Sequence, residues 1–195
     1  MRCPRVHHPS CYVTGCQRLI ASHHQPSTKL TGMPLKETST PYPLLDADPH
    51  FNRVVRYFRS SDYAVWAGAT AAAPAALYAY ERIDPSRHNL RPALKMVTFV
   101  GAVGGFLLAY QRSSLRFWGW TENAREAQLD YKELSARAAA GKSLYGDSDM
   151  PPFIQGTAHR NSAFSQLKFA AIPWFNFVSH PHHGTDPEKY KAKTE

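Results

Sequence analysis

Two long stretches without any charged side chain constrain the fold of this chain more than any other feature. In the 195-residue sequence, no Asp, Glu, Lys or Arg lies in the 18 residues from Tyr63 to Tyr80 or in the 16 residues from Met96 to Gln111. As helices rising 1.5 Å per residue, the two runs would cover about 27 Å and 24 Å, close to the roughly 30 Å hydrocarbon core of a bilayer. The sequence therefore predicts a mainly α fold built on a two-span transmembrane hairpin, with spans at about 63–80 and 96–111. A buried, alanine-rich helix of a soluble protein is the alternative for the first run.

Small residues in both runs indicate how the two helices associate. They recur at every fourth position of the first run, and the second run contains a Gly-x-x-x-Gly motif. Because apolar side chains gain little from leaving lipid, membrane helices associate through small faces that let their backbones approach closely. The pattern predicts close packing of the two spans, or of the hairpin against a larger partner. The packing residues expected are Ala64, Gly68, Ala72, Ala76, Gly101 and Gly105.

Aromatic and basic side chains flank both runs, as they do at the two faces of a bilayer. Residues 51–62 have helical hydrophobic spacing with arginines between the apolar positions, which predicts an amphipathic lead-in helix at the membrane surface. A solvated basic face is an equal alternative. The interfacial anchors expected are Arg56, Arg59, Trp66, Lys95, Arg112, Trp118 and Trp120.

The rest of the chain divides by composition. Residues 1–32 are predicted to be an N-terminal extension that is disordered or missing from the mature protein, and residues 33–62 a Pro-rich arm followed by the lead-in helix. After the hairpin at 63–111, residues 112–195 are predicted to be extramembrane. They would contain a surface helix at 121–140, capped by Thr121, and an irregular aromatic-rich C-terminal arm. The rings between 163 and 178 need a surface to cover them, so the arm is predicted to dock on a partner.

Charge and cysteine placement exclude several function classes. The net charge is +8, but residues 1–36 hold five basic residues and no acidic one, so the rest of the chain is only weakly basic. Nucleic-acid binding would require a basic patch on a folded face and is not expected. All three cysteines lie within the first 16 residues. Cys11, Cys16, His23 and His24 are possible zinc ligands, but their spacing is not that of a common zinc finger.

No pattern in the chain predicts catalysis. His180, His182 and His183 lie close together, but Asp186 is the only carboxylate near them in the sequence, so no metal site is expected. Neither span contains a charged residue that would serve a proton relay or an ion path. Nucleotide-binding, hydrolase and metalloprotease motifs do not occur. We therefore expect no catalytic or cofactor-binding residue and no small-molecule substrate.

Several stretches together resemble one known family. They are residues 41–50 (PYPLLDADPH), 51–58 (FNRVVRYF), the alanine-rich run, 111–119 (QRSSLRFWG) and 176–184 (NFVSHPHHG). Over roughly residues 40–190 the chain is similar to the fungal 21-kDa-type accessory subunit of mitochondrial NADH:ubiquinone oxidoreductase, respiratory complex I. Residues 1–32 lie outside this resemblance.

The resemblance implies a two-helix subunit of the membrane arm, in the mitochondrial inner membrane. Its partners would be other membrane-arm subunits of complex I and the lipid bilayer, and it would carry no cofactor. Its role would be to stabilise or help assemble the arm that supports electron transfer from NADH to ubiquinone and proton pumping. Two alternatives stay open: a two-span assembly or import factor that contacts its client transiently, and a peripheral metal-binding or redox protein that uses the Cys and His residues.

Overall fold

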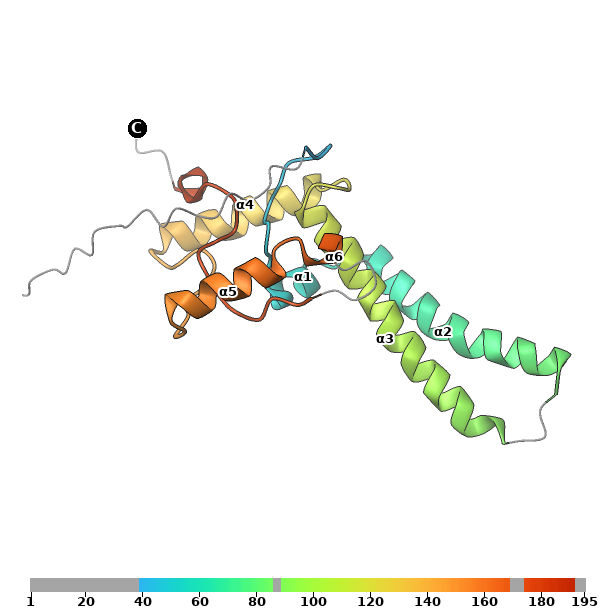
Figure 1. Ribbon diagram of the computed structural model, residues 1–195. Helices are drawn as coiled ribbons and strands as arrows, with labels where there is room; N and C mark the ends of the chain where they lie inside the picture. The colour runs from blue at the N-terminus through green and yellow to red at the C-terminus, as the bar shows by residue number, and fades with distance from the viewer. Residues whose placement is uncertain (1–38, 86–88, 169–173, 192–195) are drawn as a thin grey trace, which may run out of the picture. The chain divides into compact units, whose positions relative to one another are not determined.

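The computed structural model describes residues 39–85, 89–168 and 174–191, and these residues form helices, turns and irregular segments without any strand. The prediction of a mainly α fold is confirmed. The predicted N-terminal extension at 1–32 lies outside the described residues. In chain order the helices are α1 (Phe51–Arg56), α2 (Ser60–Ile83), α3 (Leu90–Phe117), α4 (Ala124–Ala139), α5 (Pro152–Ser162), α6 (Ser165–Lys168) and the short 3-10 helix η1 (Pro187–Tyr190) (Figure 1).

The two longest helices, α2 and α3, lie side by side as an antiparallel hairpin (Figure 1). They have 24 and 28 residues, so each extends beyond its charge-free run. Within the described helices, only α3 is both long and apolar enough to cross a membrane. The prediction of two spans is therefore not confirmed. The reason lies in the composition of α2, because alanine supplies little apolar surface and half of its charge-free run is alanine.

The C-terminal end of α3 is fixed by a glycine that no other residue could replace without strain. Gly119 has a φ of +74°, and a Cβ at this position would clash with the Tyr42 carbonyl oxygen. The amide of Trp120 donates to the Leu115 carbonyl oxygen over 3.0 Å, which closes the last turn in a Schellman arrangement. After this turn the chain lies beside residues 42–45, whose backbone amides donate hydrogen bonds to carbonyl oxygens at the end of α3.

At the end of the hairpin where α2 begins and α3 stops, the remaining elements form a head with its own core. The core combines residues from the arm before α1, from α1 and from the last third of α3. Its members are Leu45, Val54, Tyr57, Phe58, Ala109, Tyr110, Phe117 and Trp118. The last third of α3 is thus covered by the head, whereas only 22% of its most apolar 18-residue window is buried.

Several element predictions need correction. In the Pro-rich arm, residues 45–48 are buried in the head, so this part lies along the chain's own core. The lead-in helix is shorter than predicted: α1 ends at Arg56, and the side chain of Arg53 is buried. The N-cap position of the surface helix is Asn123 and not Thr121, and the Asn123 side chain makes no capping hydrogen bond. The C-terminal arm, predicted to be irregular, contains α5 and η1 as well as the four-residue α6.

Candidate functional site: the hairpin seam and the buried polar network of the head

The seam between α2 and α3 is built on the two glycines of the Gly-x-x-x-Gly motif. A Cβ at Gly101 would lie 2.8 Å from Ala73 Cβ, and one at Gly105 would lie 2.8 Å from the Trp66 carbonyl oxygen. The indole Nε1 of Trp66 donates to the Ala102 carbonyl oxygen over 2.9 Å. Both glycines therefore lie at a point of close approach between the two helices.

On α2, the small residues expected in this seam lie elsewhere. The face of α2 that meets α3 is formed by Trp66, Ala69, Thr70 and Ala73. The predicted stripe is exposed along its whole length, and a Cβ at Gly68 would meet nothing within 4 Å. The stripe of Ala64, Gly68, Ala72 and Ala76 is thus not the α2 side of the seam, and the other expectation for it, a larger partner, stays open.

Buried ion pairs join the foot of the hairpin to α4. Asp62, in the first turn of α2, is fully buried and accepts hydrogen bonds from the guanidinium of Arg116 near the end of α3. Glu126 of α4 lies 3.2 Å from Arg116 Nε and accepts from Arg59 Nε over 2.7 Å. Arg112 reaches Asp62 over 3.3 Å. Because breaking one partner of a buried pair leaves an uncompensated charge, this cluster holds the three helices in one arrangement.

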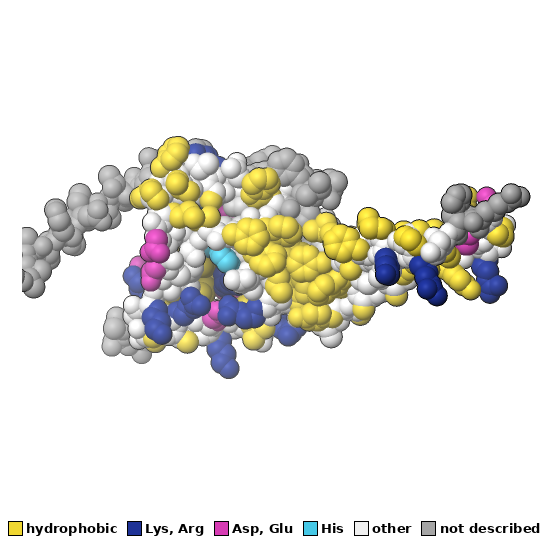
Figure 2. All heavy atoms as spheres, turned by 90° about the horizontal axis from the view of Figure 1, so that it is seen from below, with side chains coloured by type: hydrophobic (Ala, Val, Ile, Leu, Met, Phe, Trp, Pro, Cys, Tyr) yellow, Lys and Arg dark blue, Asp and Glu magenta, His cyan; other side chains and the backbone are white. Residues whose placement is uncertain are grey.

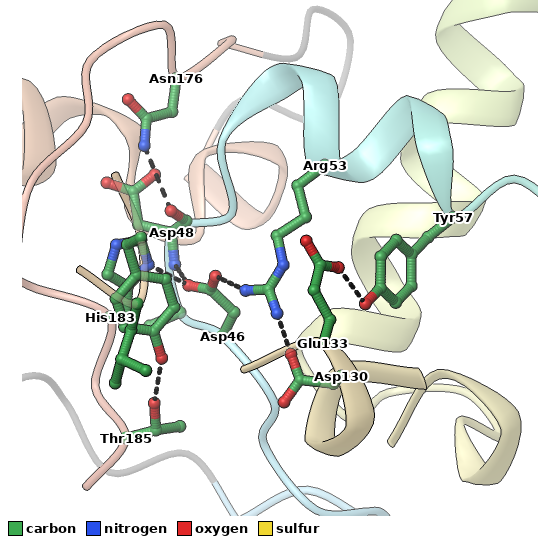
Figure 3. A network of polar contacts seen from close by, with 12 residues as sticks. Asp46, Asp48, Arg53, Tyr57, Asp130, Glu133, Asn176, His183 and Thr185 are labelled. Carbon is green, nitrogen blue, oxygen red and sulfur yellow. Dashed lines mark hydrogen bonds and ion pairs between the residues drawn. The ribbon is translucent and has the colours of Figure 1, made fainter. Parts of the chain in front are cut away.

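A second polar network fills the centre of the head (Figure 3). Arg53 of α1 donates to Asp46 Oδ2 over 2.8 Å and to Asp130 of α4. The hydroxyl of Tyr190 in η1 donates to Asp130 Oδ2 over 2.7 Å. Burial alone would raise the pKa of Asp46, but His183 and Arg53 outweigh it and hold that pKa below its usual value. The network links three parts of the chain that are far apart, around residues 46–53, 130 and 183–190.

Both ring nitrogens of His183 face acceptors. Nδ1 lies 2.7 Å from Asp46 Oδ1, and Nε2 lies 2.7 Å from the His180 carbonyl oxygen. Each nitrogen of the ring is therefore within hydrogen-bond distance of an oxygen atom. The ring also stacks on Tyr145, with 3.5 Å between centroids. His183 is therefore a buried ring that is held between Asp46, the His180 carbonyl oxygen and Tyr145.

Asp48 is the centre of a third cluster, which joins the arm, α5 and the C-terminal segment. Its Oδ2 lies 2.8 Å from His180 Nε2, 3.2 Å from His159 Nδ1 and 2.6 Å from Ser162 Oγ. Burial opposes ionisation, but the hydrogen bonds from the two histidines and Ser162 hold the pKa of Asp48 below its usual value. Asn176 Nδ2 donates to the Asp48 carbonyl oxygen over 3.2 Å.

The predicted interfacial anchors are placed in different surroundings. Trp118 is only 2% exposed, and its Nε1 donates to the Ala47 carbonyl oxygen, so it is a core residue of the head and its prediction as an anchor is wrong. Trp66 lies in the seam. Arg56 pairs with Glu133 over 2.6 Å. Arg59 and Arg112 form ion pairs with acidic residues of the protein. Lys95 and Trp120 are exposed.

Large apolar side chains are exposed on both the hairpin and the head, and Figure 2 shows them as a broad yellow patch. On the hairpin they include Tyr63, Tyr78, Tyr80, Met96, Phe99, Val100, Val103 and Leu108. On the head, a groove of about 670 Å³ lies between α5 and the segment after residue 173. Phe153, Trp174 and Phe177 at this groove are each more than half exposed. A patch of this kind is typical of a surface that a partner or lipid covers.

Sequence reasoning missed the polar network of the head. In the sequence, Asp46 and Asp48 are polar residues of a Pro-rich arm, and Arg53 belongs to a basic helix face. His159 and His180, whose ring nitrogens lie within hydrogen-bond distance of Asp48, are 111 and 132 residues away from it in the chain. No local spacing rule connects groups at such separations.

The fold and these surfaces define a mainly helical protein in which a helix of membrane-spanning length is joined to an ion-paired head. Comparison with known proteins then specifies the family. A family model described as "NADH-ubiquinone oxidoreductase complex I, 21 kDa subunit" matches residues 39–122. A second model, described as "C-terminal of NADH-ubiquinone oxidoreductase 21 kDa subunit", matches residues 131–195. The NADH-ubiquinone oxidoreductase 20.9 kDa subunit of Neurospora crassa is 48% identical over 163 residues, which cover 82% of this chain and 86% of that subunit.

The chain belongs to the family of 21 kDa subunits of NADH-ubiquinone oxidoreductase, complex I. The resemblance found in the sequence is thereby confirmed. Membership connects the chain with mitochondria, the respiratory chain and electron transport, and it implies association with the mitochondrial inner membrane.

Proposed function

We propose that this chain is a non-catalytic accessory subunit of mitochondrial complex I that stabilises or helps assemble the membrane arm. In this proposal a two-span hairpin formed by α2 and α3 holds the subunit in the inner membrane, and the other membrane-arm subunits and the lipid cover its apolar faces. Family membership supports the assignment to complex I. The observation that carries the role is the exposure of α3, because only 22% of its most apolar window is covered by the chain itself.

The ion pair that joins the start of α2 to the end of α3 supports α2 as a second membrane span. The buried pair of Asp62 and Arg116 joins the start of α2 to the end of α3, and the two helices then run side by side. If α3 crosses a bilayer, the far end of α2 must lie on the opposite side from the head. A modestly apolar helix inserts more readily when a neighbour shares its interface, and the seam at Gly101 and Gly105 supplies that neighbour.

The pairing of polar groups in the head supports a structural role. The buried carboxylates of Asp46, Asp48, Asp62 and Asp130 all accept hydrogen bonds from arginine, histidine, serine or tyrosine side chains. Groups that are satisfied in this way fix the arrangement of helices and are poorly placed to exchange protons with a substrate. The head would thereby hold a defined shape against its neighbours in the complex.

Membrane topology tests the anchor. The three native cysteines lie in residues 1–16, so replacing them with serine gives a background for single-cysteine probes. Asn89→Cys lies at the far end of the hairpin, and Lys142→Cys lies just after α4, where both side chains are exposed. In sealed mitochondrial inner-membrane vesicles, an impermeant maleimide should label one of the two sites and not the other. Equal labelling of both would contradict two spans.

Loss of the chain tests the role. A strain without this chain should accumulate less intact complex I on native gels and more membrane-arm subcomplexes. If that strain instead contained fully assembled but inactive complex I, a purely structural role of the chain would be contradicted. A transient assembly factor predicts the same assembly defect, but its protein would be missing from the finished complex. Native gels probed for this chain therefore separate the two roles.

A further inference from the structure

The Asp48 cluster has the composition of a metal site that the sequence analysis did not expect. Asp48, His159 and His180 each offer one ligand atom, and these three atoms all lie within 4.8 Å of one another. They come from the arm before α1, from α5 and from the segment that precedes η1, so only the folded head brings them together. Carboxylate oxygen and imidazole nitrogen are common ligands of zinc and other borderline divalent metals.

We propose that Asp48, His159 and His180 bind one divalent metal ion, with Zn²⁺ as the ion that this ligand set fits best. Three protein ligands leave a fourth tetrahedral position for water or for His182, whose ring lies 5.4 Å from the His159 ring and 5.9 Å from the His180 ring. Such a site would fasten α5 and the C-terminal segment to the arm of the head. It goes beyond the accessory role proposed above and does not depend on it.

The distances from Asp48 to the two histidines are close to those a tetrahedral ion requires. Zinc bonds of about 2.0–2.1 Å place neighbouring ligand atoms roughly 3.3 Å apart. Asp48 Oδ2 and His159 Nδ1 are already 3.2 Å apart, whereas Asp48 Oδ2 and His180 Nε2 are 2.8 Å apart. The pair formed by Asp48 and His180 would have to open by about 0.5 Å to admit the ion.

Metal binding would replace hydrogen bonds in which the histidines donate. His180 Nδ1 accepts from the His182 amide over 3.2 Å, so Nε2 carries the proton that is donated to Asp48. To bind the ion through Nε2, the neutral ring must carry its proton on Nδ1, and the His182 amide must turn away. At His159 the proton must likewise move from Nδ1 to Nε2. The ring charge does not change in either step, so neutral histidine and ionised aspartate remain the ligands.

The surrounding groups favour this site over the other histidines. Ser162 Oγ donates to Asp48, and Asn176 Nδ2 donates to the Asp48 carbonyl oxygen, which together fix the carboxylate. His183 is not a ligand in this arrangement, because its two nitrogens already lie 2.7 Å from Asp46 Oδ1 and 2.7 Å from the His180 carbonyl oxygen. The side chain of His159 is 14% exposed, which leaves an entry path from solvent on that side.

Titration of the purified full-length chain in detergent with Co²⁺, and then with Zn²⁺ in competition, tests the proposal. We expect saturable binding of one Co²⁺ with the visible spectrum of tetrahedral nitrogen and oxygen ligands. His159→Gln should weaken the binding at least tenfold while the far-UV circular dichroism stays unchanged. A matched control, Cys11→Ser with Cys16→Ser, removes the N-terminal thiols and should leave both affinity and spectrum intact.

A measurement on the unaltered protein covers the case in which the variant does not fold. Diethyl pyrocarbonate should modify His159 in the metal-free chain, and Zn²⁺ should protect this residue, as read by peptide mass spectrometry. The proposal is overturned if the folded chain shows no saturable Co²⁺ binding, if His159→Gln binds as tightly as the wild type, or if binding is lost with the two cysteines. Absence of protection at His159 would overturn it as well.

Discussion

Replacing Gly101 with alanine tests the packing of the hairpin with the smallest possible change. The added Cβ would lie 2.8 Å from Ala73 Cβ and 3.1 Å from the Ala69 carbonyl oxygen, and neither atom belongs to a flexible side-chain end. Carbon atoms pack at about 3.5–4.0 Å, so α2 and α3 would have to separate locally by about 0.7–1.2 Å. Overpacking of this kind costs about 1–3 kcal/mol.

Gly104 supplies the matched control on the same helix. A Cβ at Gly104 would meet nothing within 4 Å. Gly104→Ala therefore only removes the flexibility of a helical glycine, which stabilises by about 0.5–1 kcal/mol. Both variants lose one helical glycine of α3, so that gain cancels, and they should differ by the overpacking cost alone, roughly 1–3 kcal/mol in the free energy of unfolding.

Unfolding of the purified full-length chain with sodium dodecyl sulfate in mixed micelles, followed by far-UV circular dichroism, measures this difference. We expect Gly101→Ala to unfold at a lower detergent fraction than the wild type and Gly104→Ala at an equal or higher one. If both variants shift the transition by the same amount and in the same direction, the seam does not lie at Gly101 and the reasoning is wrong.

Three further outcomes follow from the head and from the exposed face of α2. Asp46→Asn leaves Arg53 and His183 without their common carboxylate and should destabilise the chain by about 3–5 kcal/mol, while the exposed Glu188→Gln should change little in the same titration. Burial, followed by the neighbouring imidazoles, lowers the pKa of His182 below 6.5, so the unfolded state binds this proton more readily and thermal stability should fall as the pH drops through 6.5. His182→Gln should reduce the dependence of the melting temperature on pH in this range, and an unchanged dependence would contradict the assignment. Gly68→Leu should leave the isolated chain as stable as the wild type, because the position is open, but should reduce its incorporation into complex I on native gels; normal incorporation would show that the small-residue stripe has no partner.

The sequence was sufficient for the hairpin because charge patterning acts over whole helices. The runs at 63–80 and 96–111 lie inside α2 and α3, and Gly101 and Gly105 lie in the seam. The face of α2 could not be predicted in the same way. Alanine occupies positions all around that helix, so small residues do not distinguish one side from another. The decisive residue is Trp66, which packs on Phe106 and donates to Ala102, and its aromatic ring had suggested an interfacial position.

The head was harder to predict because long-range pairing determines it. Asp48 contacts residues more than a hundred positions away, and the ion pair of Asp62 and Arg116 joins positions 54 apart. Trp118 follows a basic segment at the predicted membrane exit, yet the arm folds over it and its indole donates to Ala47. A Pro-rich segment has the same local pattern whether it lies on a partner or on its own core, so burial of residues 45–48 needed the three-dimensional structure.

Quantitative mass spectrometry of the purified, intact complex I, before and after it is split into its matrix and membrane arms, tests the central claim most directly. An accessory subunit predicts one copy of this chain per complex and its recovery with the membrane arm. A sub-stoichiometric amount in the intact enzyme, or recovery with the matrix arm, would contradict the proposal that this chain is a permanent part of the membrane arm.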